Sequence, residues 1–352
     1  MTDADLNRPH RRSLDDFRCR ASRLPFALLV ALSAVSSTAA DRSGDDPVLA
    51  SWRDTAPRHA IVEFVNRVTN EQSDQFVPPA ERIAVFDNDG CLWCEQPMYF
   101  QLLFAVDRVK ALAGEHPEWK NQQPFAAIIS DDKQALAKLT EHDAAAIVAA
   151  THAGITTDEF AEVVEDWLET ARHPVYDRLY TELTYQPMVE LLEFLRANGF
   201  KTFIVSGGGI DFLRVFAEDV YGIPPEQVIG SSSKTKYELR DDEPVLVKLA
   251  EIGSIDDKHG KPVNIQLHIG RRPVMAFGNS DGDLQMLQWT TAGDGPRFGL
   301  LVHHTDSERE YAYDRDSHIG RLDAALDEAK RQAWTVVDMK ADWKTVFSET
   351  QN

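Results

Sequence analysis

The stretch that decides the fold is AVFDNDGCLWCEQP, residues 84–97. Residues 82–86, RIAVF, predict a short buried strand, and Asp87 and Asp89 follow it directly. Successive residues of an extended chain point to opposite sides, so both carboxylates can share one side while Asn88 points away. Burying a charge is costly unless something is bound there. The pair therefore either holds a cation and does chemistry or closes an Asx-type turn.

The composition is that of an ordinary globular protein, with 352 residues, 43% hydrophobic and 27% charged. This length allows two structural units at most, or one domain with a sizeable insertion. The formal charge of −20 comes without a basic patch, which argues against a nucleic acid as partner. No apolar run approaches the roughly 20 residues that a membrane-spanning helix needs.

The N-terminus is typical of an export signal. Six arginines between residues 8 and 23 precede the apolar run PFALLVALSAV, and the small residues SSTAA follow. We expect residues 1–40 to be a signal peptide that is cleaved near Ala39 or Ala40, giving a periplasmic or secreted protein without stable membrane insertion. An amphipathic or disordered leader is the alternative. Export would leave Cys91 and Cys94 as the only cysteines, and we expect free thiols, with a disulfide as the alternative.

Strands and helices are predicted to alternate along the chain. Strands are expected at residues 82–86, 201–209, 273–277 and 298–303, with short strands over 228–249. Helices are expected at residues 59–73, 98–113, 131–150, 157–171, 186–197, 212–221 and 319–333. This alternation predicts an α/β fold, a Rossmann-like three-layer core around a parallel sheet.

Three predicted strands end in polar or glycine-rich runs, at residues 87–90, 206–209 and 278–283. In doubly wound sheets, ligands bind beyond the carboxyl ends of the strands. We therefore expect these three ends to form the functional site. The third run, GNSDGD, offers one amide and two carboxylates, which suit Mg²⁺. No Cys/His pattern supports zinc, and His303-His304 is interpreted as a strand end.

The second run, Ser206 with three glycines, offers a hydroxyl and unobstructed backbone N–H groups at the start of a helix. This pattern favours an anion, although a plain tight turn is the alternative. A lysine could neutralise that anion. Lys261, at the head of a short helix-like segment, is the candidate. Lys234 and Lys236 lie in the hairpin region and are interpreted as solvated.

Taken together and in this order, the two aspartates, Ser206, Lys261 and the acidic run at residues 278–283 resemble the motifs of the haloacid dehalogenase superfamily of phosphohydrolases. The family's DxDxT motif matches residues 87–91, its strand-end Ser or Thr matches Ser206, its lysine matches Lys261, and its acidic motif matches residues 278–283. The mostly helical stretch between the first two motifs looks like the cap of phosphoserine-phosphatase-like members. The resemblance implies a core of residues 41–97 and 186–352 with an inserted helical cap of residues 98–185.

The resemblance also implies roles for single residues. Asp87 is expected to attack phosphorus, and Asp89 to serve as acid and base for the leaving alcohol. Ser206, the Gly207 N–H and Lys261 are expected to hold the phosphoryl oxygens. The Mg²⁺ site is expected to comprise Asp87, the Asp89 carbonyl, Asn279 and Asp283, the last ordering a ligand water or Lys261.

The sequence departs from the family pattern twice, because Cys91 replaces the usual Thr and Asn279 a metal-binding Asp. Glu95, among aromatic residues, is the candidate to receive an amine or quaternary ammonium group of the substrate. The alternatives are that the aromatic residues pack in the core of the cap and that Glu95 caps their helix. We expect a Mg²⁺-dependent phosphomonoesterase that acts on a small phosphorylated metabolite. A phosphotransferase or mutase of the superfamily, or a catalytically weak relative that binds metal or anion, is the alternative. The sequence leaves the oligomeric state open.

Overall fold

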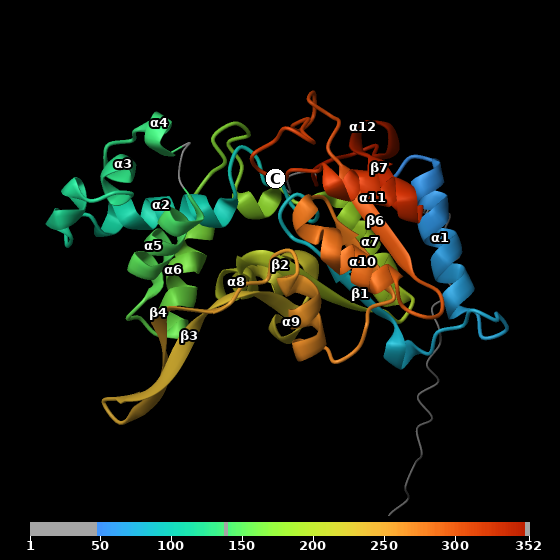
Figure 1. The fold of residues 1–352 in the computed structure, drawn as a ribbon, viewed down its shortest axis with the longest axis horizontal. Helices are drawn as coiled ribbons and strands as arrows, with labels where there is room; N and C mark the ends of the chain where they lie inside the picture. Colours follow the sequence, from blue (N-terminus) through green and yellow to red (C-terminus); the bar gives the residue numbers. More distant parts are fainter. Residues whose placement is uncertain (1–47, 137–139, 349–352) are drawn as a thin grey trace, which may run out of the picture. The chain divides into compact units, whose positions relative to one another are not determined.

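A seven-stranded sheet in the order β4-β3-β2-β1-β5-β6-β7 organises residues 48–136 and 140–348, which are the residues that this computed structural model describes (Figure 1). Its strands are β1 (Ile83–Phe86), β2 (Lys201–Gly209), β3 (Val228–Arg240), β4 (Glu243–Ser254), β5 (Met275–Gly278), β6 (Phe298–His303) and β7 (Thr335–Asp338). Neighbouring strands are parallel except for the antiparallel hairpin of β3 and β4. The predicted signal peptide and Cys19 lie outside the described residues.

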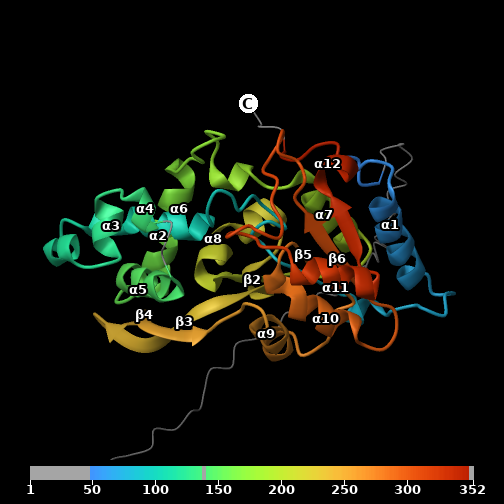
Figure 2. The same ribbon diagram turned by 45° about the horizontal axis from the view of Figure 1, so that its top comes forward.

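Helices cover both faces of the sheet, as Figures 1 and 2 show. Ala84 and Phe86 of β1 pack in one core cluster with α1 (Ala56–Thr69), α7 (Gln186–Ala197) and α8 (Ile210–Tyr221). Ile83 and Val85 pack on the opposite face with α9 (Gly260–His268), α10 (Leu284–Thr291) and α11 (Ala324–Gln332). A strand buried on both faces is an unbroken apolar run, which is why IAVF shows no polar alternation. The predicted three-layer α/β core is confirmed.

A group of helices lies between β1 and β2 in the chain. It comprises α2 (Phe100–Leu112), α3 (Phe125–Ile129), α4 (Lys133–Leu136), α5 (Glu141–His152) and α6 (Thr157–Thr170). Val109, Trp119, Phe125 and Ile128 form part of a separate small core there. Thr156 begins α6 with a capping box to Glu159, as the sequence predicts. The exact limits of the cap, residues 98–185, stay a prediction.

Several predicted elements differ from the observed ones. The helix expected over residues 131–150 begins later, because Asp131 takes a left-handed conformation, and it is divided into α4 and α5, because Thr140 caps a new helix. The short strands expected over 228–249 are two long strands, β3 and β4. The short strand β7 and the final helix α12 (Met339–Asp342) were not predicted. Each has only four residues, which is too few to show a pattern of apolar and polar positions.

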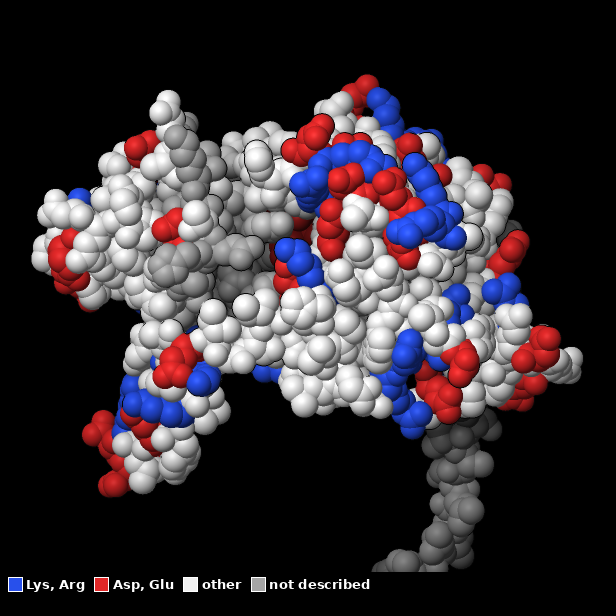
Figure 3. Space-filling model, in the orientation of Figure 1, with Lys and Arg blue, Asp and Glu red and all other residues white. Residues whose placement is uncertain are grey.

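Charged side chains of opposite sign lie next to one another on the face drawn in Figure 3. Exposed pairs in the described residues include Arg321 with Asp323 at 2.9 Å and Lys340 with Glu308 at 2.9 Å. Such pairs contribute about 0–1 kcal/mol each. The buried clusters therefore hold the fold. No helix in the described ranges is long and apolar enough to cross a membrane.

Candidate active site

The three polar strand ends meet at one edge of the sheet because β2, β1 and β5 are neighbours. Phe86 of β1 lies opposite Ile204 of β2 and Phe277 of β5. The backbone N–H of Asp87 donates to the carbonyl of Phe277 at 2.9 Å, which continues the ladder one residue beyond β1. Parallel strands place their carboxyl ends at one edge. The site predicted from three separate stretches is thus one location.

A tight turn directs the chain out of the sheet after Asp87. The carbonyl of Asn88 accepts hydrogen bonds from the N–H groups of residues 91–93 at 3.2, 2.8 and 3.3 Å. Gly90 has a φ of +72°, in the left-handed region that favours glycine. A Cβ at this position would overlap the Asn279 amide and the Glu95 carboxylate. Glycine is therefore required at position 90 because the backbone is left-handed there and because no space is left for a side chain.

Lys261 lies between two buried carboxylates. Its Nζ lies 2.6 Å from Asp87 Oδ1 and 2.6 Å from Asp283 Oδ1, and all three side chains are almost removed from water. The other oxygen of Asp283 accepts from the N–H groups of Asn279 and Ser280 at 2.9 and 3.1 Å. Asp283 therefore anchors both Lys261 and the loop after β5.

The site holds more negative than positive charge. Burial raises the pKa of Asp87 well above its usual value, and Asp283 adds to this while Lys261 opposes it. Burial also raises the pKa of Asp89, to about 6, although Trp93 opposes this by donating to Asp89 Oδ1 at 2.7 Å. Burial alone would lower the pKa of Lys261, but Asp283 and Asp87 outweigh it and raise that pKa. A bound cation would relieve this excess of negative charge.

The residues present fit Mg²⁺. A carboxylate accepts hydrogen bonds, so the Asn279 Nδ2 group faces Glu95 Oε1, at 2.8 Å, and its Oδ1 faces away. This Oδ1 is buried and has no hydrogen-bond partner among the described residues, as expected of an oxygen that awaits a ligand. No cluster of three His, Cys, Asp or Glu side chains in the described part of the chain could hold a metal. Mg²⁺ needs only one or two carboxylates beside other oxygens and water.

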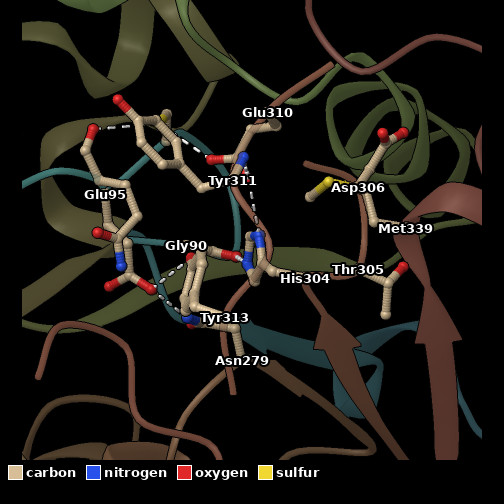
Figure 4. Close-up of polar contacts among 12 residues, drawn as sticks. Gly90, Glu95, Asn279, His304, Thr305, Asp306, Glu310, Tyr311, Tyr313 and Met339 are labelled. Atoms are coloured by element: carbon tan, nitrogen blue, oxygen red, sulfur yellow. Dashed lines mark hydrogen bonds and ion pairs between the residues drawn. The ribbon is translucent and has the colours of Figure 1, made fainter. Parts of the chain in front are cut away.

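Buried contacts from the chain after β6 hold the turn in place (Figure 4). His304 lies between two acceptors, the carbonyl of Gly90 at 2.8 Å and Glu310 Oε2 at 3.2 Å. The ring of Tyr313 stacks on His304 at 4.3 Å, and its hydroxyl donates to Glu95 Oε1 at 2.8 Å. The Glu310 carboxylate also accepts from Cys94, Tyr185 and the backbone of Tyr311. The segment that follows β6 thus supports both Gly90, through His304, and Glu95, through Tyr313.

The phosphate-binding candidates lie at the end of β2. Ser206 is fully buried, and its Oγ accepts from the Gly208 N–H at 3.1 Å. A Cβ on Gly208 would lie 3.3 Å from Ser206 Oγ and 3.7 Å from Asp89 Oδ2, so both groups flank the same glycine. Gly207 is exposed and directly follows Ser206 in β2.

The remaining candidates lie as follows. Lys234 and Lys236 are exposed on β3, where they pair with glutamates. Cys91 and Cys94 are buried free thiols, as predicted. Glu95 is buried and bonded to Asn279 and Tyr313, so its predicted contact with a substrate amine stays a prediction. Sequence reasoning interpreted His304 only as part of a strand end and did not find Glu310 or Tyr313. Their spacing follows no motif, and only the run of polar and aromatic residues after the last predicted strand marks them.

Comparison with protein-family models identifies the family of the chain. The family model of the haloacid dehalogenase-like hydrolases matches residues 84–288, more than half of the chain. The chain therefore belongs to the haloacid dehalogenase-like hydrolase family. The predicted superfamily is confirmed, and the predicted HAD-type phosphatase is confirmed as a hydrolase of this family. None of the curated proteins searched matches the chain.

Solved structures are similar in fold. A conserved protein of unknown function from Anaerococcus prevotii is 16% identical, with 83% of this chain and 96% of that chain covered and a TM-score of 0.50. A protein of unknown function from Bordetella pertussis is 16% identical, with 74% and 99% covered and a TM-score of 0.45. A probable phosphoserine phosphatase from Vibrio cholerae is 14% identical, with 75% and 62% covered and a TM-score of 0.37. At these identities the likeness concerns the fold alone.

The Lys261 contacts predict a large loss of stability on removing its charge. Lys261→Met keeps the apolar stem but leaves Asp87 and Asp283 buried without their cation, which costs about 3–5 kcal/mol. Urea unfolding followed by circular dichroism measures this change. Lys258→Met is the matched control, because Lys258 is exposed and lies 3.8 Å from its partner Asp257. Equal stabilities for the two variants would contradict the assigned role of the ammonium group.

Proposed function

We propose that the protein hydrolyses small phosphomonoesters with the help of Mg²⁺, through a phosphorylated Asp87. The observation that carries this proposal is the arrangement of Asp87, Lys261 and Asn279. One carboxylate is held by a buried ammonium, and the neighbouring strand end presents a buried carbonyl oxygen that has no hydrogen-bond partner in the described part of the chain. Phosphoryl transfer depends mainly on positioning and charge neutralisation, and this arrangement is suited to both. Membership of a hydrolase family supports it.

In the proposed reaction, Asp87 is the nucleophile and Asp89 transfers the protons. A carboxylate oxygen of Asp87 forms a bond to phosphorus while the bond from phosphorus to the alcohol oxygen breaks. Asp89 gives its proton to that departing oxygen, and its pKa, which burial raises to about 6, makes the protonated form required for this step more abundant than in an ordinary aspartate. Asp89 then takes a proton from water, which attacks the phosphoryl group. Phosphate leaves, and the Asp87 carboxylate is restored.

The surrounding groups neutralise the phosphoryl oxygens. Lys261, the Ser206 hydroxyl and the Gly207 N–H are the proposed contacts, and Asp283 orients Lys261. Mg²⁺ bound by Asp87, the Asp89 carbonyl and the Asn279 Oδ1 would supply further positive charge at the transferring group. Asn279 is neutral where the family has a carboxylate. We therefore expect weaker metal binding than a carboxylate would give, since affinity for a hard cation depends on ligand charge.

The nucleophile is tested by substitution. Asp87→Asn should abolish phosphate release from p-nitrophenyl phosphate, because the amide is a poor nucleophile. Asp89→Asn should slow release by about 10²–10⁴-fold, as expected for loss of a general acid and base. Asp242→Asn, in the exposed turn of the β3–β4 hairpin, is the control and should keep full activity. Near-normal turnover by Asp87→Asn would refute the mechanism.

The metal is tested by removal and by restoring the missing charge. EDTA should abolish activity, Mg²⁺ should restore it, and Asn279→Asp should lower the Mg²⁺ concentration that gives half the maximal rate. Full activity in excess EDTA would exclude the metal mechanism. Phosphate that appears on an added sugar instead of in solution would identify a phosphotransferase. Failure to release phosphate from any ester at high Mg²⁺ would favour the metal- or anion-binding relative.

We also propose export, which the basic, apolar and small-residue pattern of residues 8–40 supports. Sequencing the N-terminus of the protein from the periplasm or medium should give a start near Ala40 or Asp41. Recovery of only the full-length chain, in the cytosol, would contradict export.

A further inference from the structure

A cavity of about 330 Å³ lies beside the proposed phosphate-binding loop. Residues of α5, α6, α8, β3 and β4 form its wall, together with Gln101 of α2 and with Gly207 and Gly209 of β2. Figures 1 and 2 show these helices and the hairpin close together. The size is that of a small-molecule site. The proposed mechanism uses only the glycine edge of this cavity.

The cavity begins where the leaving group would depart. Gln101 Oε1 accepts from the Gly209 N–H at 2.5 Å. A Cβ on Gly208 would lie 3.2 Å from Gln101 Oε1 and 3.7 Å from Asp89 Oδ2. Gln101 in the wall and the proposed acid Asp89 are thus close to the same glycine. An alcohol protonated by Asp89 would extend toward Gln101 and the cavity beyond it.

The charged groups of the wall are already paired. Lys248 is 3% exposed, forms an ion pair with Asp211, and its Nζ lies 4.6 Å from the centre of the Phe160 ring. Glu251 pairs with Lys234 at 2.7 Å. Among the described residues, the wall therefore offers no free charge to a ligand. A charged group that entered would lose its hydration without gaining a partner, which is costly.

The rest of the wall is mostly apolar and has two free polar atoms. Apolar residues come from both the helices and the hairpin: Val148, Phe160, Ile210, Phe212, Leu249 and Ile252. His152 Nδ1 is bonded to the Thr151 hydroxyl at 2.6 Å, whereas His152 Nε2 and Ser233 Oγ are buried without a partner among the described residues. Burial lowers the pKa of His152 to about 3, so its ring is neutral at physiological pH. A ligand with one or two hydrogen-bonding groups would satisfy these atoms.

We infer that this cavity binds the leaving alcohol, and that the preferred substrates are phosphomonoesters of uncharged, largely apolar alcohols that carry a hydrogen-bonding group or two. This inference rests on the proposed function, because it assigns the cavity to the substrate of the same site. The Lys248–Asp211 pair acts as a neutral wall that excludes ammonium and carboxylate groups. Breaking this pair from either side should therefore change which charge the cavity accepts.

The test compares three esters, 1-naphthyl phosphate, phosphoethanolamine and 3-phosphoglycerate, by kcat/KM. The wild type should prefer the naphthyl ester to both charged esters by at least about tenfold. Lys248→Met leaves the Asp211 carboxylate unpaired and should raise the relative rate with phosphoethanolamine about tenfold. Asp211→Asn leaves Lys248 unpaired and should raise the relative rate with 3-phosphoglycerate similarly. Lys236→Met, which removes an exposed lysine of the same hairpin, is the control.

The outcomes separate this inference from the proposed function. A wild type that is active but prefers a charged ester, or charge variants with the same ratios as Lys236→Met, would overturn the inference and leave the proposed function intact. If no ester is hydrolysed, the proposed function fails, and calorimetry with 1-naphthol and ethanolamine tests the cavity directly. Naphthol should bind the wild type one to one, and ethanolamine should bind only Lys248→Met. Absence of naphthol binding would also refute the cavity assignment.

Discussion

The ammonium group of Lys261 lies 2.6 Å from each of two carboxylates that water barely reaches. An isolated charge in such a place costs several kcal/mol, so Asp87 and Asp283 depend on this one cation. The contact joins the end of β1, the first turn of α9 and the loop after β5, which come from distant parts of the sequence. The same contact fixes Asp87 beside the strand end that bears Asn279. The positions of Asp87, Lys261 and Asp283 relative to one another depend on this contact.

The site holds more carboxylates than the charge of Lys261 can neutralise, and this excess of negative charge favours the binding of a cation. Asp87, Asp89 and Asp283 lie near a single buried lysine, and burial raises the pKa of Asp87 and Asp89. Glu95 adds a further carboxylate, which accepts from the Asn279 amide nitrogen, so that the amide oxygen has no partner among the residues that the structure describes. A bound cation would balance this negative charge, whereas a phosphoryl group is itself negative and depends on the positive and hydrogen-bond-donating groups. The carboxylates favour the metal, while Lys261 and the glycine-rich end of β2 favour the anion.

The sequence predicts the parts of this site that local pattern controls. Asp87 and Asn279 directly follow β1 and β5, Ser206 lies in the last part of β2, and parallel strands bring such ends to one edge. Local pattern does not predict which side chains support them. Tyr313 and Glu95 are 218 positions apart, and His304 and Gly90 are 214 apart, so their contacts depend on how loops pack across the sheet. Residues 131–150 show the same limit, because one apolar pattern covers two helices, the second of which begins at the Thr140 cap.

The central claim is that Asp87 itself carries the phosphoryl group during turnover, and trapping that acyl phosphate tests it most directly. The enzyme is mixed with substrate and Mg²⁺, quenched in acid, reduced with borohydride and digested for mass spectrometry. Reduction of an acyl phosphate converts aspartate to homoserine. The account predicts homoserine at position 87 only in samples that received substrate. Phosphate release at a normal rate with Asp87 unmodified, or with the modification at Asp89, would contradict it.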